Sequence, residues 1–598
     1  MREPKSAPKQ SGRPRRYSAE DIKTIEDLVA DGKTVNEIQT ATGATNNKIY
    51  EVIRSIEIQS QSATATMPAS LPSERARLKD IIDKAVTEGK PEELDFSIGT
   101  LEKHRKRFQN PVSGIVNPVP QESVGVYREP SRAKAVTSDV DQLDKCLQAG
   151  IPIPRFLEAG PRRNLVFSSN DKLRAAVVTT GGLAPGLNAV VHSIVYRHTK
   201  TYAALLTAGG GMYGFQNGIA GLINDDMIPL SREDTEQWLD VGGSKLGSGR
   251  GATKSDVAAY LMGKAPESTW GHQYHVLDRL VAIRRSQDES GSWTDSEISD
   301  AFEKVQREEL DIVRSNLKNK GIDILYVIGG DGSLRFANHL AKHPENDHTI
   351  VVGIPKTMDN DVMWVWTSFG YASAVDQATQ VINTLHVEAE STRRAGVIEI
   401  FGRDSGFVAA NAAFASGHVD LVLIPEAFLG KQPDEMLTLL HEYRQHLVRE
   451  VQRKRLQLKA PHLVIIVAED TEGVLRENDV ALPHPNGGFV PTNISFLEQV
   501  SEFIGRIEGL SGRFTNKPMH LVRSQEPNAQ DRIYCQRLGA LAVDNAIAGY
   551  NDFMISQWMT EYVLVPLWMV EGRKKVPTKG MFWLQVEETT GQPHAGSA

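Results

Sequence analysis

The sequence predicts an α/β protein with two doubly wound, Rossmann-like domains of parallel sheet, preceded by a small helical N-terminal extension. From about residue 173, short apolar runs alternate with segments of helical periodicity, and most runs end at Gly or Pro. Wholly apolar strands are typical of parallel sheets that helices cover on both faces. The pattern extends over about 400 residues, which is too long for one sheet, so we expect two domains. The expected strands are Ala175–Thr180, Ile322–Ile328, Ile350–Ile354, Gly396–Ile400, Leu421–Ile424 and Leu463–Ala468.

The composition excludes several classes of protein. The 598 residues are 40% hydrophobic, which rules out a chain that is disordered throughout. The 67 basic and 75 acidic side chains give a net charge of −8, which argues against bulk electrostatic binding of nucleic acid. Cys146 and Cys535 are too few for a disulfide scaffold and fit a reducing compartment. No apolar run is long enough to span a membrane and no secretory signal is recognisable, so we expect a cytoplasmic protein without membrane contact.

Three segments are expected before the α/β region. Residues 1–17 form a basic, disordered arm, residues 18–57 a helix-turn-helix-like module, and residues 58–172 a linker with a helical extension. Lys48 and Arg54 lie on the helix of the module that would read DNA. Many acids in the same helices dilute the basic surface that a DNA reader needs. We therefore favour a module for assembly or regulation over DNA binding or a tether without a partner.

Glycine-rich turns follow two of the expected strands, at Gly181–Asn188 and Gly329–Ser333. Glycines let backbone N–H groups approach a phosphate closely, and the N-terminus of the following helix favours negative charge. Asp331 in the second turn would repel a phosphate unless a cation lies between them. It is therefore a candidate Mg²⁺ ligand, directly or through water. The alternatives are plain strand-to-helix turns and, for Asp331, an N-cap.

Two further segments carry charged side chains. In Pro355–Asp361, two carboxylates follow a buried strand beside Lys356. Asp359 could accept a hydroxyl proton, as an Asp does in kinases, and Asp361 could orient the base or approach the metal. The segment Gly242–Gly251 is dense in glycine and carries two cations, which suits a polyphosphate. A solvated turn and a mobile surface loop are the respective alternatives.

In order and spacing, these motifs resemble the phosphofructokinase family over about residues 173–595. Phe401-Gly402-Arg403, Pro425-Glu426 and His520–Arg523 extend the resemblance. Two later stretches, Asn528–Cys535 and Thr590–Pro593, look like the long branch of the family. That branch includes pyrophosphate-dependent enzymes and the ATP-dependent enzymes of plants and some protists and bacteria.

The resemblance implies a 6-phosphofructokinase. Such an enzyme transfers a phosphoryl group to the 1-hydroxyl of fructose 6-phosphate and gives fructose 1,6-bisphosphate, a step of glycolysis. The resemblance further implies a phosphoryl-donor (nucleotide) lobe over residues 173–370 and a sugar-phosphate lobe over residues 371–545. Residues 546–598 would be a C-terminal segment that returns to the core.

The resemblance also implies roles for single residues. The implied catalytic residues are Lys356, Thr357, Asp359 and Asp361, with Asp359 as the proton acceptor. The donor would contact Gly182, Arg250, Gly251, Gly330, Asp331, Gly332 and Ser333, and Asp331 would hold the cofactor Mg²⁺. The sugar phosphate would contact Thr357, Met358, Asp359, Arg394, Phe401, Gly402, Arg403, Glu469, His520 and Arg523. Arg394 would reach the sugar phosphate of a neighbouring subunit, which implies a homo-oligomer, either a dimer or a tetramer.

Two positions bear on the identity of the donor. Gly332 favours ATP, because a side chain there would meet the α-phosphate of a nucleotide, and pyrophosphate-dependent enzymes typically have Asp in its place. Lys356 resembles the pyrophosphate-dependent enzymes, although an ammonium group is compatible with either donor. We favour ATP, and a pyrophosphate-dependent fructose 6-phosphate 1-phosphotransferase is the alternative. A second alternative is a DNA-binding regulator whose kinase-like domain senses a sugar phosphate. It predicts the loss of catalytic groups, yet Asp331 and Asp359 are present.

Overall fold

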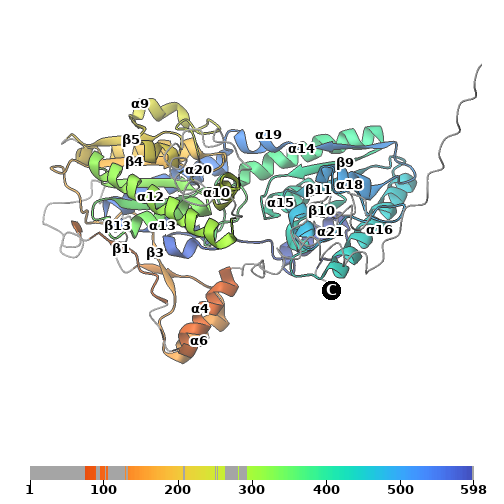
Figure 1. Cartoon of the computed structure of the whole chain (residues 1–598), viewed down its shortest axis with the longest axis horizontal. Coiled ribbons are helices and arrows are strands. Elements are labelled where there is room, and N and C mark those ends of the chain that lie inside the picture. The colour runs from red at the N-terminus through yellow and green to blue at the C-terminus, as the bar shows by residue number, and fades with distance from the viewer. Residues whose placement is uncertain are drawn as a thin grey trace, which may run out of the picture. The chain divides into compact units, whose positions relative to one another are not determined.

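A computed structural model describes most of the chain from Glu74 onward. The described residues are 74–88, 90, 94–101, 103–104, 128, 132–206, 209–249, 251, 253–262, 281 and 293–595. The expected basic arm (1–17) and helix-turn-helix-like module (18–57) lie outside this part of the chain, and so does Arg250. The described residues contain two large sheets, each covered by helices (Figure 1).

The larger sheet has nine strands among the described residues, in the order β2-β3-β15-β14-β8-β7-β4-β5-β6. Its five central strands are parallel, and short strands pair antiparallel at both edges. The parallel strands are β5 (Gly211–Phe215), β4 (Arg174–Thr179), β7 (Ile324–Gly329), β8 (Ile350–Pro355) and β14 (Phe553–Trp558). The edge strands are β6 (Met227–Pro229), β15 (Glu561–Pro566), β3 (Arg155–Glu158) and β2 (Ala133–Ala135).

Successive side chains of the central strands enter two different cores. On β4, Ala175 and Val177 belong to the core on one face, whereas Ala176 and Val178 belong to the core on the other face. This alternation follows from the two-residue period of a strand and explains why these strands are apolar throughout. The first core is closed by α7 (Leu187–Tyr196) and α20 (Ala529–Ile547), the second by α12 (Asp295–Lys320) and α13 (Asp331–Ala341).

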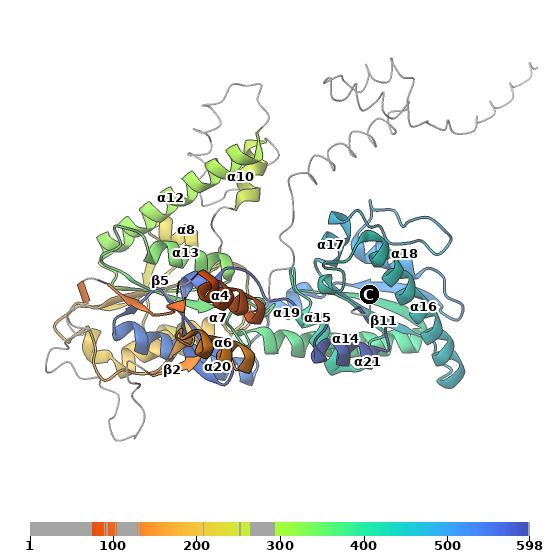
Figure 2. The ribbon, with the colours of Figure 1, turned by 90° about the horizontal axis from the view of Figure 1, so that it is seen from below.

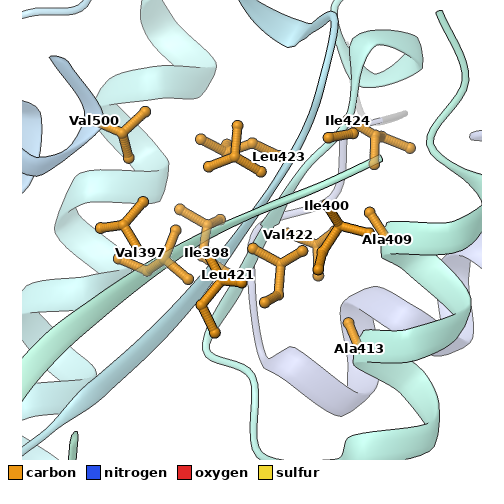
Figure 3. Packing of buried hydrophobic residues seen from close by; sticks show 14 of the residues in the cluster. Val397, Ile398, Ile400, Ala409, Ala413, Leu421, Val422, Leu423, Ile424 and Val500 are labelled. Atoms are coloured by element: carbon orange, nitrogen blue, oxygen red, sulfur yellow. The ribbon is translucent and has the colours of Figure 1, made fainter. Parts of the chain in front are cut away.

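The smaller sheet has four parallel strands among the described residues, in the order β10-β11-β9-β12. Figure 3 shows side chains of β9 and β10 against Ala409 and Ala413 of one helix and Val500 of another. All six strands predicted from the sequence are confirmed in the two sheets. The strands are β9 (Arg394–Ile400), β10 (Leu421–Leu423), β11 (Leu463–Ala468) and β12 (Gly512–Asn516). The surrounding helices are α14 (Tyr371–Thr392), α15 (Phe407–Ser416), α16 (Pro433–Gln457), α18 (Phe496–Ile504) and α21 (Met581–Thr590).

The C-terminal part of the chain serves both sheets. Helix α20 lies against α7 on the nine-stranded sheet (Figure 2). Strands β14 and β15 then extend that sheet. Helix α21 returns to the four-stranded sheet, where Trp583 and Val586 join its core. The interval 371–545 expected for a single lobe therefore divides between the two sheets. The helix that ends this interval has apolar residues that fit the core over β4 and β7.

The described part of the N-terminal extension includes strands as well as helices. Helices α4 (Glu74–Glu88) and α6 (Val140–Ala149) lie beside the antiparallel pair β2 and β3, which extends the nine-stranded sheet at β15. The indole Nε1 of Trp558 donates a hydrogen bond to the carbonyl oxygen of Val136 at 2.7 Å. The sequence predicted only a linker and helix here, because strands of three and four residues with mixed polarity show no clear period.

Shorter elements complete the described structure. None of the described helices combines the length and the apolar character that crossing a membrane requires. Helices α10 and α12 share a small core of their own. The remaining helices and strands are β1 (Gly99–Thr100), α8 (Ile219–Asn224), α9 (Arg232–Thr235), α10 (Lys254–Leu261), α17 (Thr471–Glu477), α19 (Met519–Ser524) and β13 (Tyr550–Asn551).

A buried ion pair joins α20 to Arg197, the residue directly after α7, and its removal should destabilise the fold. Arg197 binds both carboxylate oxygens of Asp544 at 2.8 and 2.9 Å, and Tyr202 donates to the same carboxylate at 2.8 Å. The Asp544 side chain is 2% exposed. Asp544→Ala should lower the free energy of unfolding by about 3–5 kcal/mol, because it leaves the guanidinium group without its partner. Chemical denaturation followed by tryptophan fluorescence measures this change.

The matched control is Glu450→Ala on α16, whose partner Arg453 is 47% exposed. Its loss should cost about 1 kcal/mol or less. An equal effect of the two substitutions would contradict a special role for the buried pair.

Candidate active site

A cleft of about 850 Å³ lies where the carboxyl ends of strands from both sheets meet. Turns after β4, β7 and β8 line one side, and turns after β9 and β11 line the other. Ligands in open α/β sheets bind at this edge, because the turns there are free to vary. The predicted site residues that line the cleft are Gly182, Gly251, Gly330, Asp331, Gly332, Ser333, Lys356, Thr357, Met358, Asp359, Asp361, Phe401, Arg403, Glu469 and Arg523.

Lys356 connects the turn after β8 to the glycine-rich turn after β4. Its ammonium group donates a hydrogen bond to the carbonyl oxygen of Gly182, and its side chain is buried. Burial lowers the pKa of Lys356 to about 8, although the neighbouring carboxylates, Asp359 first, act in the opposite direction. The group therefore keeps most of its positive charge at neutral pH, directly beside the glycines.

The junction of β7 and α13 has one glycine that the fold requires and one that it does not. A Cβ atom at Gly329 would lie 2.2 Å from the Thr180 hydroxyl oxygen and 2.4 Å from the Ser333 Cβ, so a side chain would force the turn apart. A Cβ atom at Gly332 would meet no atom within 4 Å. The protein itself thus leaves room at Gly332, and a side chain there would project into the cleft.

Asp331 follows this turn and faces three guanidinium groups. Its carboxylate lies 3.3 Å from Arg573, 3.3 Å from Arg335 and 3.6 Å from Arg403. Burial by itself would raise the pKa of Asp331. The guanidinium groups, Arg573 first, outweigh burial and hold the pKa below its ordinary value. The carboxylate is therefore ionised at neutral pH.

The Thr357 side chain forms hydrogen bonds with two other residues of the turn after β8. The Thr357 hydroxyl donates to a carboxylate oxygen of Asp361 at 2.9 Å and accepts the backbone N–H of Asp359 at 3.1 Å. Burial raises the pKa of Asp359 to about 7, and the nearby carboxylates of Asp361 and Glu469 add to this effect. Asp359 is therefore a carboxyl group that can exchange a proton near neutral pH.

The opposite side of the cleft presents cations on a rigid frame. The backbone N–H of Arg403, a residue in the left-handed conformation with φ of 49°, donates to Glu469 at 3.1 Å. The guanidinium carbon of Arg523 lies 5.4 Å from the ring centre of Phe401. A guanidinium group can bind a phosphate monoester through two parallel N–H···O hydrogen bonds. The arrangement suits an anionic ligand that also carries hydroxyl groups.

Three predicted residues of the described chain do not line the cleft. Gly402 lies in the turn after β9, where a Cβ atom would lie 2.2 Å from the backbone oxygen of Ser405. His520 lies beside Arg523, with 3.5 Å between a guanidinium nitrogen and the ring Nδ1. Arg394 is the exposed first residue of β9, whose seven residues separate it from the cleft by about 20 Å. It is too far away to reach the cleft of its own chain.

The structure also brings in residues that the sequence analysis did not select. Arg573 contacts Asp331, Asp361 and Asp404, which come from both sides of the cleft. It lies more than 200 positions from Asp331 in the sequence, in a stretch of cations, Arg573 to Lys575, that resembles a solvated turn. In the sequence, only the three consecutive cations after Gly572 could have indicated that this segment belongs to the site.

Four apolar side chains of α8, α12 and α13 also line the cleft, beside polar neighbours such as Glu309. They are Ile219, Phe302, Leu310 and Phe336. Ile219 and Leu310 are buried, and the two phenylalanine rings are partly exposed to the cleft. A phosphate group has no use for such surface, whereas a planar heterocycle does.

Asp331 is the residue best placed to hold a metal ion. No group of three or more His, Cys, Asp or Glu side chains suited to a metal occurs among the described residues.

Comparisons with known proteins agree on one family. A family model described as Phosphofructokinase matches residues 174–546. A Borreliella burgdorferi protein named ATP-dependent 6-phosphofructokinase is 32% identical over 449 residues, with 73% of this chain and 85% of that protein covered. A protein of the same name from Amycolatopsis methanolica is 31% identical, with 74% and 84% covered. The Arabidopsis thaliana protein named ATP-dependent 6-phosphofructokinase 4, chloroplastic, is 26% identical, with 84% and 83% covered.

Proposed function

The chain belongs to the phosphofructokinase family, and we infer that it is an ATP-dependent 6-phosphofructokinase. It transfers the γ-phosphoryl group of ATP to the 1-hydroxyl of fructose 6-phosphate. The observation that carries this inference is that Asp331 and Asp359 line one cleft together with Lys356. Phosphoryl transfer needs an aligned hydroxyl and neutralised charge more than covalent help, and this cleft offers both.

Asp359 is proposed as the group that accepts the proton of the 1-hydroxyl. A base works best when its pKa lies near the working pH, and the pKa of Asp359, raised by burial to about 7, meets this condition. The Thr357 hydroxyl holds the backbone of Asp359 and the carboxylate of Asp361 in one arrangement. This hydrogen bond helps to hold Asp359 in the cleft, where it can orient the oxygen of the 1-hydroxyl.

The donor side supports ATP over pyrophosphate. The open space at Gly332 leaves room for a third phosphate, and the apolar side chains of the lining, Ile219, Phe302, Leu310 and Phe336, offer a surface for a base. Pyrophosphate would use neither feature. Lys356 and the backbone of the glycine-rich turns would neutralise the phosphates of the donor.

We further propose Mg²⁺ as the divalent metal, with Asp331 as its protein ligand. When bound, the ion neutralises donor phosphate oxygens and withdraws charge from the leaving group. On the sugar side, Arg403 and Arg523 would bind the 6-phosphate, and Glu469 would accept hydrogen bonds from sugar hydroxyls. The Arg403 backbone N–H orients Glu469 for this task.

A homo-oligomer, dimer or tetramer, is proposed for the active assembly. Arg394 is exposed and lies at the end of β9 away from the cleft, so any contact it makes with a sugar phosphate would be with that of a neighbouring subunit. DNA binding by residues 18–57 stays a prediction, as does the cytoplasmic location. The regulator hypothesis is not favoured, because the groups that chemistry needs are present and share one cleft.

Replacing the proposed base should remove catalysis and spare binding. Asp359→Asn should lower kcat about 10²- to 10⁴-fold, the usual contribution of a positioned base, while the Kd of fructose 6-phosphate stays within about threefold. A coupled assay for fructose 1,6-bisphosphate and calorimetric titration give the two values. The control Asp347→Asn removes a carboxylate that is 68% exposed on the surface and should leave both unchanged. Near-normal turnover of Asp359→Asn would refute its role.

Activity should depend on pH with two limbs. The base works only when ionised, and burial raises the pKa of Asp359 to about 7, so kcat/KM should fall as the pH drops below about 7. Lys356 carries its charge only when protonated, and burial lowers its pKa to about 8, so kcat/KM should also fall above about pH 8. The acid limb should be absent in Asp359→Asn. A wild-type profile that is flat from about pH 5.5 to 7.5 would contradict the assignment.

The donor assignment is tested at Gly332. The wild type should turn over with ATP and not with pyrophosphate. Gly332→Asp should lower kcat/KM for ATP about 100-fold or more, because a carboxylate would stand beside the phosphates of the nucleotide. Gly332→Ala adds bulk without charge and should lower it about tenfold or less, since a Cβ meets no protein atom within 4 Å. Turnover of the wild type with pyrophosphate alone would overturn the assignment.

A further inference from the structure

We propose that Arg573 is a positioning residue for phosphoryl transfer: it fixes Asp331 and Asp361 on one side of the cleft against Asp404 on the other. The proposal rests on the proposed function and adds to it a residue of the C-terminal segment. Arg573 does not line the cleft, so it acts through the carboxylates that do. Its side chain is 15% exposed and its charge faces inward.

Each end of the guanidinium group has its own carboxylate. Nη2 lies 3.3 Å from Asp331, Nε lies 3.8 Å from Asp361, and Nη1 forms an ion pair with Asp404. A guanidinium group is planar and rigid, so these contacts fix the relative positions of all three carboxylates. A lysine at this position could not do the same, because its charge is a single point.

The three carboxylates come from different parts of the fold. Asp331 and Asp361 follow β7 and β8 of the nine-stranded sheet, whereas Asp404 follows β9 of the four-stranded sheet. Arg573 is therefore bound to both sides of the cleft at once. Because the donor and the acceptor bind on opposite sides, a change of about 1 Å in this spacing would misalign the attacking oxygen and the phosphoryl group.

The backbone around Arg573 is itself held from both sides. Gly572 has a φ of 94°, a left-handed conformation that turns the chain toward the cleft. The backbone N–H of Lys574 donates to the carbonyl oxygen of Asp361 at 2.8 Å, and its ammonium group donates to the side chain of Asn360 at 3.2 Å. On the other side, the backbone N–H of Val576 donates to the buried carboxylate of Glu426 at 3.0 Å.

Glu426 extends this connection into the four-stranded sheet. The same carboxylate accepts the backbone N–H of Gly406 at 3.0 Å, which lies two positions after Asp404. The ammonium group of Lys575 donates to the carbonyl oxygen of Asp404. The segment from Gly572 to Val576 is thus tied to the turn after β8 and to the turn after β9. An arginine held this firmly would lose little freedom when substrates bind, which is what a positioning residue requires.

The charge of Arg573 has a second consequence for the site. Asp331 and Asp361 would each repel an incoming polyphosphate, and together they would repel each other. Arg573 neutralises them from behind while leaving the cleft itself open to the donor. Arg573 therefore both fixes the spacing of the carboxylates and neutralises their charge.

The test compares Arg573→Met, Arg573→Lys and Asp404→Asn with the wild type. Arg573→Met should lower kcat about 100-fold, while KM for both substrates and the calorimetric Kd of fructose 6-phosphate stay within about threefold. Arg573→Lys should restore the charge but not the planar geometry, with kcat about tenfold below the wild type. Asp404→Asn should also lower kcat about tenfold, and only about threefold or less when Arg573 is already Met, because the two act through one contact.

The matched control is Arg453→Met on α16, which removes an arginine paired only at the surface and should leave all values unchanged. The proposal is overturned if Arg573→Met keeps kcat within about threefold of the wild type, or if kcat and substrate binding fall in parallel. It is also overturned if kcat of the double variant falls by the product of the two single effects of Arg573→Met and Asp404→Asn. If Arg573→Met does not fold, Arg573→Lys and Asp404→Asn decide by the same criteria. A wild type without activity would instead refute the proposed function.

Discussion

Three carboxylates share one cleft in this protein, and nearby cations must balance their charge. Asp331 follows β7, and Asp359 and Asp361 follow the adjacent strand β8, so their mutual repulsion is built into the fold. Lys356 supplies opposing charge beside Asp359, and Arg573 supplies it at Asp331 and Asp361. The balance is incomplete at Asp359, whose pKa is raised by burial to about 7. That residue is left able to take up a proton, while Asp331 stays ionised.

The fold delivers these groups by simple means. Parallel strands bring their carboxyl ends to one edge, and two such sheets facing each other turn two edges into a cleft. The C-terminal segment then crosses between the sheets, so that a residue remote in sequence joins the carboxylates of both. Folding of the complete chain is therefore a condition for a complete site. This also explains why the last fifty residues contribute strands to one sheet and a helix to the other.

Local sequence patterns predicted the features that depend only on neighbouring residues. The six apolar strands were predictable, because buried parallel strands are apolar at every position, and glycines marked the turns after two of them. The pair β2 and β3 and the place of α20 were not, since short strands of mixed polarity and a long helix can each pack in several ways. Arg573 was missed because its three partners are set by tertiary structure alone. Arg394 belonged to the resemblance, and its own chain gives it no contact with the cleft.

We infer that a nucleotide and a sugar phosphate meet in this cleft, with Asp359 beside the reacting alcohol. A crystal structure of the enzyme with Mg²⁺, a non-hydrolysable ATP analogue and fructose 6-phosphate measures this directly. We expect a distance of about 2.6–3.2 Å between a carboxylate oxygen of Asp359 and the oxygen of the 1-hydroxyl. A sugar bound away from Asp359, or a nucleotide bound outside the cleft that Asp331 lines, would contradict it.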